Sequence, residues 1–138
     1  MSNDLRKMTG KDLMIGDLVF RPACYDVVTE IRKDGIIGSD ILRGLIPFSE
    51  IEPIPLTDEI MAKNFSQYSE SYEPNFSKEY LITDIGATIT YDVVTRLIGL
   101  PVRNIAGDWE FYSIKEIKYV HQLQHFLRML NIEKEIQL

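Results

Sequence analysis

The clearest hydrophobic pattern in the chain lies between residues 113 and 131, with the sequence SIKEIKYVHQLQHFLRMLN. Apolar side chains recur there at three- and four-residue spacing, which is the period of an amphipathic helix that buries one face. They are Tyr119, Val120, Leu123, Phe126, Leu127 and Leu130. Ser113 and Glu116 have the spacing of a capping box, which predicts that the helix starts at Ser113. We expect the rest of the chain to be organised around this helix.

Short segments rich in β-branched residues, separated by turn residues, dominate the first half of the chain. Strands are predicted at residues 15–20, 25–31 and 45–48. Asp34 and Gly35 predict a tight hairpin turn after the second of these, because glycine adopts the positive φ that such a turn needs. Pro47 confines the third strand to a sheet edge, since proline has no N–H for a ladder. The spacing favours a small curled antiparallel sheet of the SH3-like barrel type.

The second half combines a short helix, a linker and a further sheet. Thr57 is a predicted N-cap for a helix that ends near Asn64. Residues 65–78 have neither helical nor strand periodicity and form the predicted main linker. Further strands are predicted at residues 80–83, 87–98, 102–105 and 108–112, forming a β-meander that the C-terminal helix covers. The fold class is therefore α+β. The chain divides into residues 1–64, the linker 65–78 and residues 79–138, and the two halves either are separate or share one core.

Two patterns in these segments have alternative interpretations. The linker contains the aromatic residues Phe65, Tyr68, Tyr72 and Phe76, which suit either base stacking or packing onto the protein. Packing is favoured, because acidic residues accompany them where single-strand binders carry Lys or Arg. The sequence YDVVT occurs at residues 25–29 and again at 91–95, which indicates either an internal duplication or coincident strand composition.

Composition limits the class of protein. The chain has 138 residues, of which 45% are hydrophobic, enough for one substantial core. Its formal net charge of −6 repels phosphate backbones and disfavours nucleic acid as a partner. Cys24 is the single cysteine, which excludes an intramolecular disulfide and indicates a reducing compartment. No apolar run approaches the roughly 20 residues of a membrane span, so we expect a cytoplasmic protein with no membrane partner.

The sequence contains no recognisable catalytic or cofactor-binding motif. His121 and His125 have the spacing of a helical zinc-binding pair, but Gln122 stands where metalloproteases have a glutamate base, and two histidines alone are too few ligands for zinc. We therefore expect no metal and no cofactor. Cys24 is expected to be a buried thiol rather than a nucleophile. The glycines are scattered singly and form no phosphate-binding loop, and no pair of aspartates stands out as acid and base.

Three blocks of sequence suggest a family. They are LMIGDLV at residues 13–19, IEPIPLT at 51–57 and IKYVHQLQ at 117–124. In this order they resemble small uncharacterised proteins of prophages and mobile elements in gut Bacteroidetes, in which an opening like LRIGN-x-V, a central IPLT and a closing YVHQLQ recur. The chain departs from that pattern at Asn64-Phe65, where relatives often have Gly-Phe, and in its tail. The resemblance implies a genomic context and no mechanism.

The polar side of the predicted C-terminal helix is the candidate binding site. It carries Lys118, His121, His125 and Arg128, bordered by Gln122 and Gln124. Such a face either is solvated or docks an acidic surface or a phosphate, with affinity that rises as the histidines protonate. The predicted function is non-catalytic binding of an unknown protein partner by an accessory protein of a mobile element. The alternatives are a nucleic-acid-binding module that uses the small barrel or this helix face, and a small enzyme with an unidentified carboxylate site.

Overall fold

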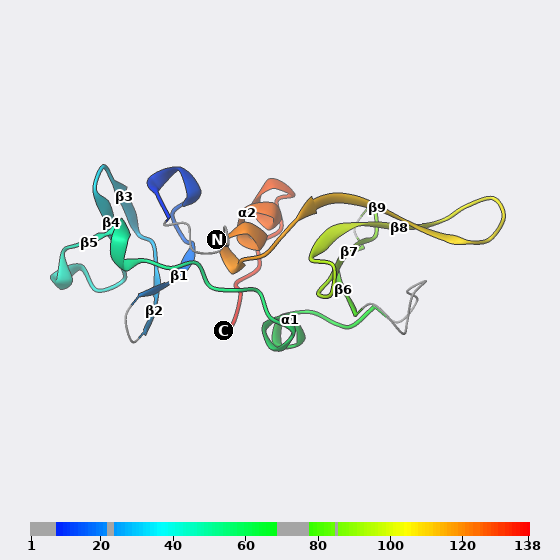
Figure 1. Cartoon of the computed structure of the whole chain (residues 1–138), viewed down its shortest axis with the longest axis horizontal. Helices are drawn as coiled ribbons and strands as arrows, with labels where there is room; N and C mark the ends of the chain where they lie inside the picture. Colours follow the sequence, from blue (N-terminus) through cyan, green and yellow to red (C-terminus); the bar gives the residue numbers. More distant parts are fainter. Residues whose placement is uncertain (1–7, 22–23, 69–77, 85) are drawn as a thin grey trace, which may run out of the picture. The chain divides into compact units, whose positions relative to one another are not determined.

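The structure is a computed structural model that describes residues 8–21, 24–68, 78–84 and 86–138 (Figure 1). It is α+β, as predicted, with antiparallel sheets and α-helices. The chain divides into two compact units: unit 1 comprises residues 1–55 and 119–134, and unit 2 comprises residues 56–118 and 135–138. This division groups the central helix with the second sheet and the C-terminal helix with the first, unlike the predicted boundaries. Most of the predicted linker, residues 69–77, lies outside the described residues.

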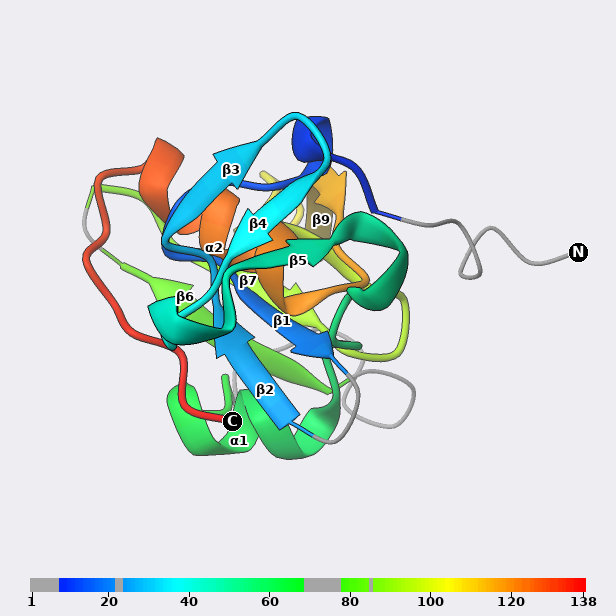
Figure 2. The same cartoon turned by 90° about the vertical axis from the view of Figure 1, so that its left-hand side faces the viewer.

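Unit 1 contains two small antiparallel sheets (Figure 2). The first pairs β1 (Leu18–Arg21) with β2 (Cys24–Val27), and the second has the order β3 (Glu30–Arg32), β4 (Gly35–Ile37) and β5 (Leu45–Pro47). A hairpin does lie at this place, but its turn residues are Lys33 and Asp34, and Gly35 is the first residue of β4 and lacks the predicted positive φ. Glycine is required there because a Cβ would lie 2.1 Å from the carbonyl oxygen of Ile46 on β5. The strand with Pro47 is an edge strand, as predicted. Neither sheet closes into a barrel among the described residues, and the SH3-like architecture stays a prediction.

Strand side chains and two flanking segments form the core of unit 1. Its buried members are Met8, Leu13, Val19, Val28, Ile36, Ile46 and Ile51. The helix α2 (Val120–Met129) belongs to the same unit. The central part of its predicted apolar stripe is confirmed, because Val120, Leu123, Phe126 and Leu127 are all buried. Burial of this face attaches the helix to its unit.

The predicted start of this helix is wrong. Ser113 and Glu116 lie in the strand β9 (Trp109–Glu116), where they face Gly99 and Leu97 of the neighbouring strand. The helix begins only at Val120, and Gln122 Oε1 accepts a hydrogen bond of 3.2 Å from the backbone N–H of Tyr119. A capping-box pattern supplies two local hydrogen bonds, whereas the β-ladder supplies bonds along the whole strand and so overrides it.

Unit 2 combines the helix α1 (Asp58–Asn64) with a four-stranded antiparallel sheet. The sheet has the order β6 (Glu79–Thr83), β7 (Ile89–Asp92), β8 (Leu97–Arg103) and β9. Thr57 caps α1 as predicted, since its hydroxyl accepts from Ile60 N–H at 3.3 Å. In Figure 1 the hairpin of β8 and β9, drawn in yellow to orange, extends well beyond β6 and β7.

The strand boundaries in unit 2 differ from those predicted. Residues 93–96 form a turn inside the segment 87–98 that was predicted as one strand, and Arg96 has a φ of 63°. Gly99 and Pro101 fall between the strands predicted at 87–98 and 102–105, but both lie within β8. Glycine is required at residue 99 because a Cβ there would lie 2.2 Å from the carbonyl oxygen of Tyr112. Both residues are therefore part of the sheet and do not interrupt it.

Aromatic and aliphatic side chains fill the core of unit 2. The hydroxyl of Tyr91 donates to the carbonyl oxygen of Ile117, and burial raises the pKa of Tyr91 to about 12. The C-terminal tail follows α2 and is held at its end by hydrogen bonds to α1. Asn64 accepts from Gln137 N–H at 2.7 Å and donates to Gln137 O at 2.8 Å, and Ile136 is buried. Among the described residues, no helix has the length and apolar character needed to cross a membrane.

Candidate functional site

A buried carboxylate organises the polar residues of α2. Asp17, in the turn before β1, has no exposed surface. Its Oδ2 accepts from Met14 N–H at 2.7 Å and lies 2.6 Å from His125 Nε2, while its Oδ1 accepts from Arg128 Nη1 at 2.8 Å. An ionised carboxylate only accepts hydrogen bonds, so His125 donates from Nε2. The side chains of His125 and Arg128, both on α2, therefore bind the buried carboxylate of Asp17.

Gln124 makes a second link between α2 and β1. Its Oε1 accepts from Leu18 N–H at 2.8 Å, and its Nε2 donates to Gly16 O at 3.2 Å. His121 is also buried, with its ring centroid 5.9 Å from that of Tyr119 and 5.5 Å from that of His125. These side chains therefore occupy the interior of unit 1.

The predicted outward face is accordingly not a continuous surface. Gln124, His125 and Arg128 converge on the backbone or carboxylate of residues 16–18, and His121 packs beside them. Gln122 belongs to the start of the helix, as described above. Lys118 precedes α2 and pairs with Glu116 at 3.7 Å. The face thus holds the fold together, and a binding role for it stays a prediction.

Asp17 is the residue that sequence reasoning missed at this site. It is separated from His125 by 108 positions, and no motif connects them. Strand-end aspartates are common, so the residue type alone carried no signal. Its burial is a consequence of how β1 and α2 pack, which only the tertiary structure shows.

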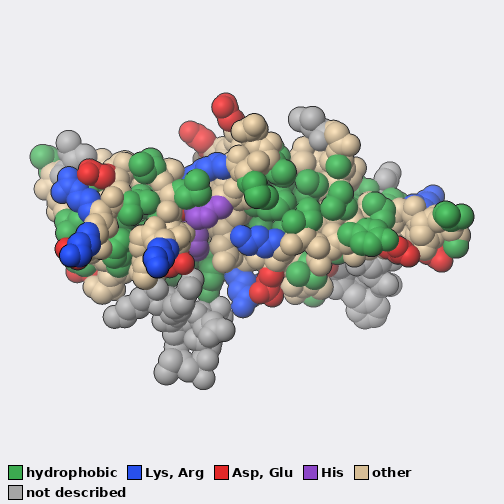
Figure 3. All heavy atoms as spheres, turned by 90° about the horizontal axis from the view of Figure 1, so that it is seen from above, with side chains coloured by type: hydrophobic (Ala, Val, Ile, Leu, Met, Phe, Trp, Pro, Cys, Tyr) green, Lys and Arg blue, Asp and Glu red, His purple; other side chains and the backbone are tan. Residues whose placement is uncertain are grey.

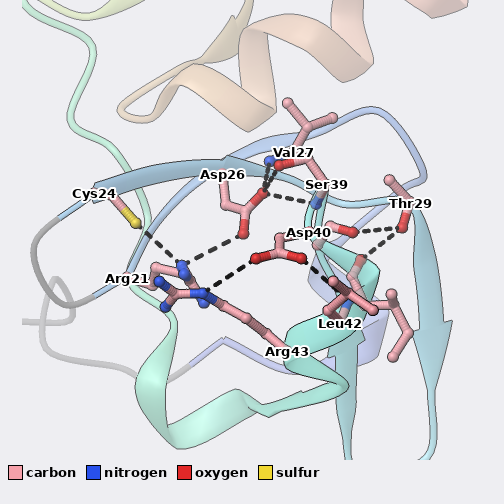
Figure 4. Close-up of polar contacts among 11 residues, drawn as sticks. Arg21, Cys24, Asp26, Val27, Thr29, Ser39, Asp40, Leu42 and Arg43 are labelled. Carbon is pink, nitrogen blue, oxygen red and sulfur yellow. Dashed lines mark hydrogen bonds and ion pairs between the residues drawn. The ribbon is translucent and has the colours of Figure 1, made fainter.

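A second polar cluster joins β1 and β2 of unit 1 to the residues after β4 (Figure 4). Asp26, on β2, is buried and accepts from Val27 N–H at 2.8 Å, from Ser39 N–H at 2.9 Å and from the Ser39 hydroxyl at 2.8 Å. Arg21 Nε lies 3.4 Å from its other oxygen. Burial by itself raises the pKa of Asp26, but the hydrogen bonds from Ser39 and Val27 and the charge of Arg21 outweigh it and lower that pKa below its ordinary value.

The only cysteine lies at the edge of this cluster. The expectation of a buried thiol is wrong, because Cys24 is exposed. Arg21 Nε donates to its Sγ at 3.1 Å, so a basic group does lie next to the thiol, three residues away in sequence. The two residues are cross-strand partners at the end of the β1–β2 hairpin. Both histidines lie on α2, where His125 binds Asp17, and the cluster itself contains no histidine to act as a general base.

A third cluster joins α1 to β6 in unit 2. Asp58, in the first turn of α1, accepts from Lys78 Nζ at 2.7 Å and from the hydroxyl of Tyr80. The hydrogen bonds from Lys78 and then from Tyr80 lower the pKa of Asp58. Because Tyr80 is buried, the cluster acts as an attachment of the helix to the sheet rather than as an open site.

The most exposed apolar residues of unit 2 lie on the β8–β9 hairpin and the preceding turn. Tyr112 and Ile114 on β9 are 56% and 49% exposed, and Ile105 at the hairpin tip is fully exposed. Val94, in the β7–β8 turn, is 62% exposed. Figure 3 shows hydrophobic side chains in green gathered over this part of unit 2, on the right of the view. Exposed apolar patches of this kind often mark interaction surfaces.

Comparison with known proteins adds no assignment. No protein family model, no curated protein and no solved structure matches the chain. Within the described residues, no three His, Cys, Asp or Glu side chains are grouped so as to hold a metal ion. The functional assignment therefore depends on the geometry of the molecule itself.

Proposed function

We propose that this protein is a non-catalytic binding protein whose contact surface is the β8–β9 hairpin. The observation that carries the proposal is the exposure of Tyr112, Ile114 and Ile105 on a hairpin that extends beyond the rest of its sheet. An isolated exposed apolar residue needs no explanation, but several on one element favour a surface that is covered by a partner.

The hydrogen bonds of the three aspartate clusters also support a non-catalytic function. The three clusters around Asp17, Asp26 and Asp58 are occupied by hydrogen bonds within their own units. Each aspartate is held by donors of neighbouring elements, so its capacity for acid–base chemistry is already used in folding. The net charge of −6 weighs against nucleic acid as the partner, since a phosphate backbone would be repelled.

The proposal includes the context that the resemblance implies. The blocks at residues 13–19, 51–57 and 117–124 support an accessory protein of a prophage or mobile element that acts in the cytoplasm on another protein. The third block supplies Gln124, whose side chain binds the backbone of Gly16 and Leu18 in the first block. Asp17, between these two residues, stands where the family pattern has asparagine. Gln124 is thus explained by folding, and the proposal places the partner contact on the hairpin, which lies outside the three blocks.

The proposal also keeps the small-barrel architecture for unit 1. Phe20 and Glu52 exchange backbone hydrogen bonds of 2.9 and 2.7 Å, which brings the chain after the 3₁₀ turn Phe48–Glu50 back to β1. A return of the last strand to the first is what a closed small barrel requires. The contact supports an SH3-like topology with a short closing strand.

The test compares the partner recovered by matched variants. Tagged protein would be used to capture partners from cells that carry this gene, with Tyr112→Thr/Ile114→Thr as the variant and Leu42→Thr as the control. Threonine preserves strand propensity while removing apolar area. Leu42 is 93% exposed in unit 1, so the control removes a comparable exposed side chain elsewhere.

We expect the wild type and the Leu42→Thr control to recover the same partner and the hairpin variant to lose it, with equal urea midpoints for all three. Retention of the partner by the hairpin variant would overturn the proposal. Loss of the partner by the Leu42→Thr control alone would move the contact surface to unit 1 and overturn it as well.

A further inference from the structure

The strand β9 forms an open edge of the four-stranded sheet. Its inner side pairs with β8, and no described strand pairs with its outer side. The opposite edge is partly covered, since Tyr68 N–H donates to Glu79 O at 2.8 Å and Leu81 N–H donates to Ser66 O at 2.9 Å. An open edge is a template for another strand, and natural proteins usually block it with lysine, proline or a bulge.

The blocking features of β9 are confined to one end. A bulge lies opposite Ile98 and Gly99, and Lys115 follows it. The segment 109–113, WEFYS, has no lysine and no proline. Five consecutive residues of the edge are therefore open to pairing.

The register of the hairpin shows which backbone groups point outward. Asn104 N–H donates to Asp108 O at 2.8 Å, so this opposed pair is hydrogen-bonded. Hydrogen-bonded and non-bonded pairs alternate along an antiparallel ladder. The pairs of Trp109, Phe111 and Ser113 are then the non-bonded ones, and their N–H and C=O groups point away from β8. The pairing of Phe111 with Pro101, which has no N–H to donate, agrees with this assignment.

We infer that the open edge of β9 pairs with β9 of a second copy of this chain, antiparallel and centred on Phe111. The inference rests on the proposed function and names the partner of that hairpin. Around this centre Phe111 faces Phe111 of the other copy, Glu110 faces Tyr112, and Trp109 faces Ser113. All three outward-pointing residues then fall at hydrogen-bonded positions, which gives roughly six backbone hydrogen bonds between the copies.

The charges along β9 select this centre over its neighbours. A two-fold centre at Glu110 would place that carboxylate against its own copy. A centre at Tyr112 would place Asp108 opposite Glu116, and a centre at Ser113 would place Glu110 opposite Glu116. Like charges directly opposed across a ladder are destabilising. Of the centres from Glu110 to Ser113, only the one at Phe111 places no carboxylate opposite another, and it adds an aromatic pair, which is among the favourable cross-strand pairs.

In the inferred register Glu110 faces Tyr112 of the second copy, and the single chain shows that these two side chains can form a hydrogen bond. Within one chain Tyr112 donates its hydroxyl to Glu110 at 2.6 Å, and Glu110 also accepts from Asn104 at 3.0 Å. The hydrogen bond from Tyr112, followed by that from Asn104, lowers the pKa of Glu110. A carboxylate bound in this way faces a second tyrosine across the pair without an unpaired charge at the centre.

Disulfide trapping tests the register directly, in a Cys24→Ser background that removes the exposed native thiol. The Cα atoms of a hydrogen-bonded antiparallel pair lie about 5.5 Å apart, within the range of a disulfide. We expect Phe111→Cys to form a covalent dimer under mild oxidation and Trp109→Cys alone to form none. A mixture of Trp109→Cys and Ser113→Cys proteins should form the mixed dimer.

Sedimentation of the otherwise unmodified protein supplies an independent readout. We expect the mass to rise from 16.0 kDa toward twice that value with concentration, and more readily at high salt, because each copy carries a net charge of −6. Ser113→Pro removes an outward N–H without touching the bonded pairs of β8, so it should stay folded by circular dichroism and sediment as a monomer.

Two results would overturn the inference: equal cross-linking of the Phe111→Cys and Trp109→Cys proteins, or a monomeric mass at every concentration and salt. Either would leave the proposed function standing, because the capture comparison of the Tyr112→Thr/Ile114→Thr variant is a separate measurement. Failure of the proposed function would instead appear as retention of the captured partner by the Tyr112→Thr/Ile114→Thr variant.

Discussion

Replacement of Asp17 by asparagine is the sharpest test of how unit 1 is held together. The side chain keeps its size and can still accept one hydrogen bond from Met14 N–H. It loses the negative charge that binds His125 Nε2 and Arg128 Nη1, at distances of 2.6 and 2.8 Å. The amide also brings a donor NH₂ group toward these donors. Breaking a buried ion pair by removing one partner costs roughly 3–5 kcal/mol.

The expected loss lies near the lower end of that range. The side chains of His125 and Arg128 are 26% and 32% exposed, so both keep some contact with water when the carboxylate charge is removed. We expect Asp17→Asn to reduce the free energy of unfolding by about 3 kcal/mol, a large part of the 5–15 kcal/mol typical of a domain. With a urea slope of about 2 kcal/mol/M, the midpoint would fall by about 1.5 M.

The assay is urea unfolding followed by far-UV circular dichroism at pH 7. Glu30→Gln is the matched control, because it removes a carboxylate whose pair with Arg32 is exposed, and its midpoint should not change. The double variant Asp17→Asn/Arg128→Met should lose less than the sum of the two single variants, since they share one interaction. A midpoint of Asp17→Asn equal to that of the wild type would refute the structural role assigned to this carboxylate.

Three further predictions concern the core and the Asp26 cluster. Leu123→Asp places an unpaired charge in the core of unit 1 and should yield unfolded or insoluble protein, whereas Met129→Asp on the exposed side of the same helix should stay folded in the same solubility and dichroism measurements. Gly38→Ala should destabilise by about 1–3 kcal/mol in urea, because its Cβ would lie 2.2 Å from Asp26 Oδ2; an unchanged midpoint would contradict this contact. The pKa of Asp26 is lower in the folded chain, so its stabilising effect is present above the ordinary aspartate value of about 3.9 and is lost as pH falls through the folded pKa. The stability difference between the wild type and Asp26→Asn should therefore narrow between pH 7 and pH 3, and a constant difference would argue against the assignment.

Two local patterns were read correctly from the sequence. The edge position of Pro47 and the Thr57 cap each follow from the properties of a single residue. The buried stripe of α2 follows from the period of the helix itself. These features are decided within a few residues of chain, so the sequence is sufficient for them.

Contacts between distant segments determine where the candidate site residues lie and whether they are buried. His121 was expected on the polar face of the helix and Gln124 at its border, and both are buried. Gln124 satisfies a donor and an acceptor next to β1, and a polar group that finds such partners loses little on burial. No periodicity in the sequence records that β1 would offer these groups.

The start of α2 and the β8–β9 hairpin also depend on contacts between segments that are distant in the chain. Ser113 and Glu116 carry a valid capping pattern, but pairing with β8 places them in a strand. Pro101 falls between two predicted strands but lies within β8 and faces Phe111, at a position where no N–H is needed. The sequence by itself determined which face of α2 is apolar, that Pro47 lies at a sheet edge, and that the fold is α+β. Only the tertiary structure decided which polar groups are satisfied inside and which strand edge stays open, because both depend on hydrogen bonds between residues that are far apart in the chain.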